Sequence, residues 1–331
     1  MIEVCLIYDI ENVKPDVLDQ TPNRLGVFNN CRFTIFNQNN IAELPSEADA
    51  VIILNTPFTE IKIKTHKELT FLVSQEATSD RYQWHKNSFH HFAEVYTQWT
   101  VNKKNIIPSH GFLTWYIDKN YDELLSVNIN KKQRTDKVAY IGNKEAILSG
   151  QVKRNNFVEA LNQAFSSHKN IAVDLIGKTY NNPIDNKFDC LNQYKYGLAI
   201  ENTLVDHYWT EKLSDIFLAG CLPFYIGPKN IVDYFSKEAI IQLDYESVEN
   251  SIQIIEQAIE NNEYEKRLEA INIARNKILH DYNLCYGFSE IINNKFETMA
   301  LRKKVDIVFP KNYWDQKQTI LQRIKNKLAK E

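Results

Sequence analysis

The chain of 331 residues is long enough for two domains of roughly 150 residues each. Apolar residues make up 44% and charged residues 24%, values that are typical of a folded globular protein and exclude a disordered or fibrous chain. The net charge of -3 and the isoelectric point near 6.3 give no overall field suited to a nucleic-acid polymer, so any basic site must be local.

The cysteine pattern favours a reducing compartment. The five cysteines are scattered, odd in number and without a CxxC pair. The first residues, MIEVCLIYDI, show no basic segment followed by a long apolar one, and no apolar run reaches the roughly 20 residues of a membrane-spanning helix. We therefore expect a cytoplasmic protein that is not embedded in a membrane.

Short apolar runs alternate with segments of helical periodicity, which predicts an α/β fold with doubly wound sheets. The expected strands are 3–8, 32–36, 50–54, 69–74, 95–99, 138–141, 171–176, 197–200, 223–226 and 240–243. The expected helices include 156–165, 211–219 and 248–259. The polar segment 118–136 is a candidate linker, so we expect one domain over residues 1–132 and a second over 133–305.

The end of the chain, residues 306–331, is expected to form a basic amphipathic tail. From 315 onward, five basic and two acidic residues surround an apolar face of Ile320, Leu321, Ile324 and Leu328. This pattern suits peripheral contact with an anionic membrane surface, and it suits equally a helix docked on the protein itself.

The segment 194–227 carries the clearest chemical signal, and it reads as strand, polar turn, helix and strand. Glu201 and Asn202 follow a strand, at the sheet edge where open α/β folds bind ligands. Thr210 is a candidate N-cap, so Lys212 lies in the first helical turn. A cation there opposes the helix dipole and is favoured by a bound anion such as a diphosphate, whereas a solvated surface lysine is the alternative.

The same segment, YKYGLAIENTLVDHYWTEKLSDIFLAGCLPFYIG, resembles the signature of the alpha-1,3/1,4-fucosyltransferase family. The resemblance implies a GT-B fold, in which two Rossmann-like domains face each other across a cleft. A second likeness lies upstream, where KVAYIGN and then KRNNFVEAL resemble the start of the family's donor domain.

The resemblance also implies roles for individual residues. Arg154 and Lys212 would hold the donor phosphates, and Glu201, Asn202, Tyr208 and Glu211 would complete the donor site. In the first half, ELTFLVSQEAT places Glu76 at the end of a strand, where it resembles the family's catalytic glutamate, although Gln75-Glu76-Ala77 departs from the usual neighbours.

A metal site is not indicated by the sequence. His85, His90 and His91 have no carboxylate or cysteine at ligand spacing, and no D-x-D follows a strand. We therefore expect neither a metal nor another cofactor. Tyr82, Trp84, Trp99 and Trp115 could stack on acceptor sugars, but large aromatic residues also fill cores, and we assign at least half of these to the core.

These features lead to one functional expectation and two alternatives. The resemblance implies an inverting transfer of fucose from GDP-fucose to a glycan hydroxyl, with Glu76 as base. The absence of a signal sequence favours a bacterial-type enzyme of the cytoplasm that acts at the inner membrane on lipopolysaccharide or capsule precursors. The alternatives are a related glycosyltransferase that uses another nucleotide sugar, and a non-catalytic module that binds glycans or nucleotides.

Overall fold

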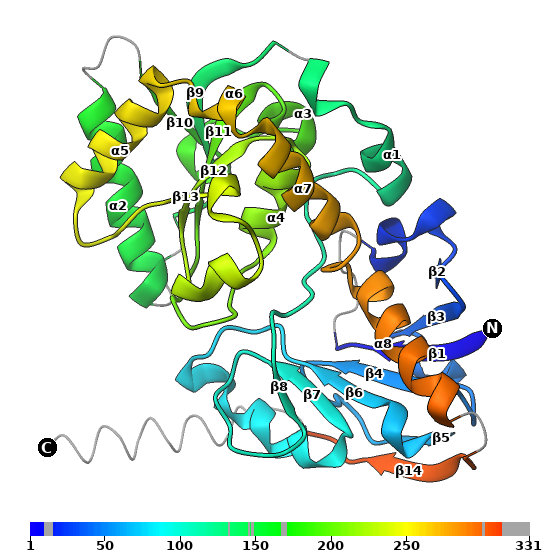
Figure 1. The fold of residues 1–331 in the computed structure, drawn as a ribbon. Coiled ribbons are helices and arrows are strands. Elements are labelled where there is room, and N and C mark those ends of the chain that lie inside the picture. The colour runs from blue at the N-terminus through cyan, green and yellow to red at the C-terminus, as the bar shows by residue number, and fades with distance from the viewer. Residues whose placement is uncertain are drawn as a thin grey trace, which may run out of the picture.

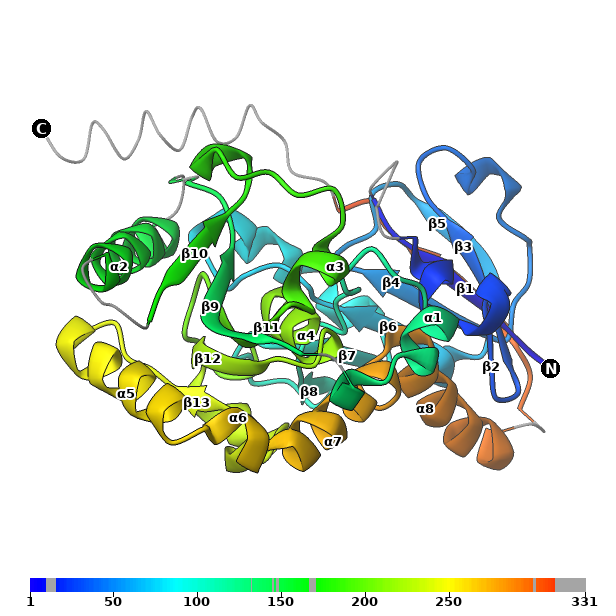
Figure 2. The same ribbon diagram turned by 90° about the horizontal axis from the view of Figure 1, so that it is seen from above.

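The computed structural model describes residues 1–9, 16–131, 133–144, 146, 149–166, 171–299 and 302–312. Within these residues the strands form two large sheets, of seven and five strands, and one small two-stranded sheet. Figure 1 shows the two large sheets one above the other, and Figure 2 shows the same arrangement from above. The expected alternation of strands and helices is present, most regularly in the second half of the chain.

The first large sheet has the order β2-β3-β1-β4-β6-β7-β8 and is parallel except for the β2–β3 pair. Its strands are β1 (Ile2–Ile7), β2 (Val27–Phe28), β3 (Cys31–Phe36), β4 (Ala50–Leu54), β6 (Thr70–Val73), β7 (Glu94–Thr97) and β8 (Ile106–Pro108). Val4 and Leu6 of β1 join one apolar cluster, while Cys5 and Ile7 join another. Both faces of the sheet are therefore covered, as parallel sheets require.

One face of this sheet packs against α8 (Leu284–Met299), where Phe288 meets Phe71 with ring centroids 5.4 Å apart. The other face is covered by the 3-10 helix Asp80–His91 and by an antiparallel pair made of β5 (Ile61–Thr65) and β14 (Val305–Phe309). The last helix and the last described strand thus return to the first sheet (Figure 1).

The second large sheet is fully parallel, with the order β10-β9-β11-β12-β13. Its strands are β9 (Thr135–Ile141), β10 (Val173–Ile176), β11 (Tyr194–Ile200), β12 (Leu222–Ile226) and β13 (Ile241–Gln242). The surrounding helices are α2 (Ser149–Phe165), α3 (Lys187–Leu191), α4 (Glu211–Leu218), α5 (Val248–Glu260), α6 (Glu263–Lys266) and α7 (Leu268–Leu279).

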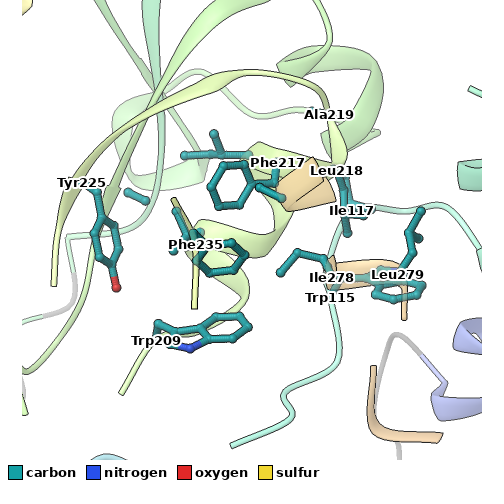
Figure 3. Packing of buried hydrophobic residues seen from close by; sticks show 14 of the residues in the cluster. Trp115, Ile117, Trp209, Phe217, Leu218, Ala219, Tyr225, Phe235, Ile278 and Leu279 are labelled. Carbon is teal, nitrogen blue, oxygen red and sulfur yellow. The ribbon is translucent and has the colours of Figure 1, made fainter. Parts of the chain in front are cut away.

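Helix α4 lies in the centre of this half, and its apolar side is fully buried. Leu213, Ile216 and Phe217 are each 4% exposed or less, as the sequence periodicity predicted. Figure 3 shows Phe217 against Phe235, with Trp209 on the far side of Phe235. This packing fixes the axis of α4 and therefore the place of its first turn.

The candidate linker 118–136 is more ordered than expected, because it contains α1 (Tyr121–Ser126). Asn120 and Glu123 form a reciprocal capping box at the start of this helix. Shorter 3-10 helices complete the connections at 17–20, 22–24, 41–43, 67–69, 129–131, 178–180, 229–233 and 237–239.

The division of the chain at residues 132 and 305 stays a prediction, and the contacts of α8 with the first sheet favour ending the second domain before this helix. The tail expected over 306–331 is wrong at its start, because residues 305–309 form β14 and pair with β5. The rest of the predicted amphipathic helix, from 315 onward, lies outside the described residues.

Candidate active site

The start of α4 is built on a buried glutamate. Glu201 follows β11 and has no exposed surface. Its carboxylate accepts hydrogen bonds from both the backbone N–H and the hydroxyl of Thr210, each at 2.8 Å. Thr210 is the N-cap of α4, as predicted, and its side chain accepts from the backbone N–H of Lys212. Glu201 therefore positions the helix start.

Lys212 lies in the first turn of α4, and its ammonium donates to the Thr210 hydroxyl at 3.0 Å and contacts two carboxylates of the protein. Its Nζ is 3.2 Å from Glu211 Oε1 and 3.7 Å from Glu201 Oε2. Burial opposes the charge of Lys212, but Glu211 and Glu201 raise its pKa overall. The negative charge expected beside Lys212 is thus partly supplied by the protein's own carboxylates, and the ammonium stays charged.

Glu211 keeps its negative charge in the same environment. Burial alone would raise the pKa of this carboxyl, but Lys212 and Lys187 lower it overall. By contrast, burial raises the pKa of Glu201, which lies deeper in the protein. Two neighbouring carboxylates of one helix start therefore differ in function: Glu201 holds the cap, and Glu211 faces open space.

A first cavity, of about 260 Å³, opens beside this helix start within the second half of the chain. Arg154, Glu211 and Lys212 contribute polar atoms to its wall, together with Lys187 and Asp215. Its apolar floor comes from β9 and β11, through Ala139, Ile141, Leu198 and Ile200. The cavity thus combines cationic groups with an apolar surface, as a nucleotide site would.

Arg154 reaches this cavity from α2 and is oriented by Asn202. Its Nη1 donates to Asn202 Oδ1 at 2.9 Å, and its Nη2 donates to the backbone oxygen of Asn143 at 3.2 Å. The approach of α2 to β11 depends on Gly150, because a Cβ added there would lie 1.8 Å from Asn202 O. The structure therefore brings Arg154 and Lys212 to one cavity, as the sequence predicted.

A second cavity, of about 290 Å³, lies on the other side of Glu211 and Lys212. Its wall includes residues from the ends of β1, β4 and β6 in the first sheet and from the β11–α4 loop in the second. Its polar lining consists of Tyr8, Asp9, Asn55, Gln75, Glu76, Thr114, Tyr116, Asn202, Tyr208, Thr210, Glu211 and Lys212. The cavity therefore lies between the two large sheets, and Glu211 and Lys212 line both cavities.

Glu76 lines the second cavity from the end of β6, at the edge where the sequence placed it. Burial raises the pKa of this carboxyl, while a hydrogen bond with Tyr82 and the charge of Arg81 oppose that effect without reversing it. A raised pKa brings a carboxylate closer to the strength of a general base at neutral pH. Tyr82 thus contacts Glu76 instead of lining the cavity.

Tyr208 lines the second cavity from a loop that is held through its neighbour His207. The preceding residue, His207, has a φ of +69°, a conformation that is uncommon for a residue with a side chain. Its backbone N–H donates to Asn230 Oδ1 at 2.9 Å, and its Nδ1 lies 2.7 Å from the hydroxyl of Tyr234. These contacts hold the loop that carries Tyr208 toward Glu211 and Lys212.

Of the seven predicted site residues, six line one or both cavities, and Glu201 lines neither. Sequence reasoning missed Lys187 and Asp215, which form an ion pair of 2.6 Å in the wall of the first cavity. Asp215 was part of the segment that carries the family resemblance, so its place one turn after Lys212 was an available signal. Lys187 gave no signal, because its sequence neighbours resemble any polar helix start.

The other candidates lie elsewhere. Tyr82, Trp84, Trp99 and Trp115 do not line the second cavity, and Trp115 is a core residue that is 1% exposed.

Burial lowers the pKa of His85 to about 4. In the described ranges no group of three or more His, Cys, Asp or Glu side chains could hold a metal ion. No helix of the described residues is both long and apolar enough to span a bilayer.

Comparison with known families finds a match in the second half of the chain. Residues 131–269 match the family model described as glycosyltransferase family 10 (fucosyltransferase), C-terminal domain. This part of the chain is therefore similar to that fucosyltransferase family. The matched range contains β9 to α6, and therefore Arg154, Lys212 and the whole first cavity. The resemblance seen in the sequence is confirmed.

Curated relatives match the chain over limited stretches. A fucosyltransferase-like protein of Arabidopsis thaliana is 33% identical over 38% of this chain and 22% of its own length. The alpha-(1,3)-fucosyltransferase FucT of Helicobacter pylori is 29% identical over 31% of this chain and 21% of its own length. The chain thus spans only about a fifth of the length of these two relatives.

Solved structures confirm the fold over most of the chain. An alpha1,3-fucosyltransferase structure has a TM-score of 0.52 and 16% identity, covering 95% of this chain and 93% of its own. A UDP-forming alpha,alpha-trehalose-phosphate synthase from Burkholderia vietnamiensis has a TM-score of 0.53 and 8% identity, covering 90% of this chain and all of its own. At these identities the likeness concerns the GT-B fold alone, which the sequence predicted.

Proposed function

We propose that this chain transfers fucose from GDP-fucose to a hydroxyl of a glycan acceptor, with inversion at the anomeric carbon. The observation that carries this proposal is that the two cavities share lining residues at the start of α4. Glu211 and Lys212 line both the cationic cavity of the second sheet and the cavity that contains Glu76. A donor bound in the first cavity would therefore present its sugar to the second, where the proposed base lies.

The donor would be held by groups that already converge on the first cavity. Arg154 and Lys212 would contact the diphosphate, and Asn202 would keep the guanidinium of Arg154 in place through its 2.9 Å hydrogen bond. Glu211 and Tyr208 would bind ribose or sugar hydroxyl groups. Because these cations are fixed before the reaction, they would stabilise the charge that develops on the leaving diphosphate.

Glu76 would take the proton from the acceptor hydroxyl. Its carboxylate lies on the first sheet, opposite the helix start that would hold the donor. Attack from that side would place the incoming oxygen opposite the departing diphosphate, which gives inversion. A positioned base of this kind typically contributes a factor of about 10^2 to 10^4 to the rate. The mechanism uses these side chains without a metal or another cofactor.

The acceptor is proposed to be a lipopolysaccharide or capsule precursor at the cytoplasmic face of the inner membrane. The sequence pattern of residues 315–331 supports this, since its five basic residues and apolar face suit an anionic surface. Two alternatives remain as outcomes for experiment: a different nucleotide sugar in the same cavities, and binding of nucleotide or glycan without turnover.

A donor panel tests the proposal directly. Purified protein would be incubated with GDP-fucose, GDP-mannose, UDP-glucose or UDP-N-acetylglucosamine and a set of galactose- and N-acetylglucosamine-containing acceptors. Release of GDP that requires both GDP-fucose and an acceptor, with a fucosylated product whose linkage is then determined, would support the assignment. Turnover with another donor alone would favour the first alternative, and binding with no turnover of any donor would favour the second.

A further inference from the structure

The first cavity contains a third cation that the proposed donor site does not use. Lys187, at the start of α3, places its Nζ 2.6 Å from Asp215 Oδ2, and both side chains line the cavity wall. The Asp215 side chain has no exposed surface, and that of Lys187 is 20% exposed. A short, largely buried ion pair therefore adjoins the place proposed for the donor diphosphate.

The Asp215 carboxylate cannot turn away from this position. It belongs to the second turn of α4, and its Oδ1 accepts the backbone N–H of Tyr116 at 2.9 Å. The backbone of Lys187 is also bonded to the segment that contains Tyr116, because its N–H donates to Asp118 Oδ2 at 2.8 Å. If the ammonium group were removed, the carboxylate would remain at the cavity wall.

The charges of the wall show why this matters for an anion. Among the ionisable side chains of the wall, Arg154, Lys187 and Lys212 are cations, and Glu211 and Asp215 are carboxylates. Burial raises the pKa of Asp215, and Lys187 opposes this effect. With Asp215 ionised, three cations against two carboxylates leave one positive charge, and without Lys187 none would remain. In a cavity that is partly shielded from water, one unit of charge has a large effect on the binding of a diphosphate.

We propose that Lys187 sets the affinity of the first cavity for a nucleoside diphosphate by neutralising Asp215. Lys187 is in this respect a positioning and charge-balancing residue. The inference rests on the proposed function, because it takes the first cavity as the donor site. It differs from a direct contact between Lys187 and phosphate, since it requires the effect of losing Lys187 to depend on the presence of Asp215.

A titration series with GDP at pH 8 and low salt tests this dependence. Calorimetric titration of Lys187→Met should show roughly tenfold weaker binding than the unchanged chain. The double variant Lys187→Met with Asp215→Asn should return to within about threefold, because the unpaired carboxylate is gone. Asp215→Asn alone keeps an amide oxygen for Tyr116 and should bind GDP at least as tightly as the unchanged chain.

Lys195 provides a matched control. Its side chain is 18% exposed and forms ion pairs of 2.7 Å with Asp136 and 2.6 Å with Glu265, but it does not line the cavity. Lys195→Met should bind GDP within about twofold of the unchanged chain. Thermal unfolding of every variant would establish that each is folded at the titration temperature.

The inference is overturned if Lys187→Met binds GDP normally, if the double variant stays as weak as Lys187→Met, or if Asp215→Asn weakens binding. Each of these results leaves the proposed function intact as long as the unchanged chain binds GDP. Failure of the unchanged chain to bind GDP would instead refute the proposed donor, and with it the inference. The two failures are therefore distinguished by the first titration of the series.

Discussion

Glu201 offers a sharp test, because its carboxylate supports the start of α4 through Thr210 and lines neither cavity. In Glu201→Ala the N–H and the hydroxyl of Thr210 both lose their acceptor. Each buried donor left without a partner costs about 1 to 3 kcal/mol. Lys212 retains Glu211 at 3.2 Å, so the remaining charge is not isolated. We expect the free energy of unfolding to fall by about 3 kcal/mol, the lower end of the range for broken buried pairs.

Glu211→Ala is the matched comparison, since this carboxylate belongs to the same helix start but is 27% exposed. After its removal Lys212 keeps its contacts with Thr210 and Glu201, so the loss of stability should be smaller than in Glu201→Ala. GDP binding should weaken, because Glu211 is proposed to bind ribose or sugar hydroxyl groups. Urea unfolding followed by tryptophan fluorescence, which reports on Trp209 near α4, measures the stability of both variants. Equal stability of Glu201→Ala and the unchanged chain, or equal loss in the two variants, would refute the assignment of separate functions.

Three further predictions concern the base, a close approach and a buried histidine. Glu76→Gln should lower kcat by about 10^2- to 10^4-fold with GDP binding unchanged, and normal kcat in the variant would exclude Glu76 as base. Activity of the unchanged enzyme should rise with pH through the raised pKa of Glu76, because the base must be ionised. Gly150→Ala should weaken GDP binding at least tenfold, since a Cβ 1.8 Å from Asn202 O must displace the partner of Arg154; unchanged binding would contradict this. Burial lowers the pKa of His110 to about 3, so at acid pH the unfolded chain binds more protons than the folded chain. Between pH 7 and pH 5 the unchanged chain should therefore lose about 2 kcal/mol more stability than His110→Phe, as measured by urea unfolding at each pH. Parallel pH profiles of the two proteins would contradict this.

The sequence predicted the longer apolar strands; of the four strands that it missed, β2 and β8 are only two and three residues long, and β5 and β14 depend on a distant partner. β5, with alternating isoleucine and lysine, pairs with β14 more than 230 residues later, and neither has a long apolar run. Likewise α7 and α8 were missed, although both are long. Where local pattern and tertiary packing agree, as in α4 with its N-cap Thr210 and its expected range, the prediction was confirmed.

The site was predictable in its residue types more than in their functions. A carboxylate after a strand and a lysine in a first turn both indicate an anion site, but the pattern cannot state which groups meet each other. In the structure Glu201 accepts hydrogen bonds from Thr210, whereas Glu211 lines two cavities. Burial decides between these functions, and it depends on the three-dimensional packing of β11 against β12 and α4.

Helix α4 is fixed along its whole length by elements from outside the second sheet. Its second turn binds the backbone of Tyr116 through Asp215, and its last turn is held by Arg275 of α7, whose Nε donates to Leu218 O at 3.2 Å. Arg275 also donates to the backbone of Leu124 in α1. The connection between the two sheets is therefore bonded to the same helix that presents Glu211 and Lys212. Since this connection also contributes Tyr116 to the second cavity, a displacement of either cavity wall would have to move α4 or break these bonds. The contacts of α4 thus tie the geometry of the proposed donor site to that of the proposed acceptor site.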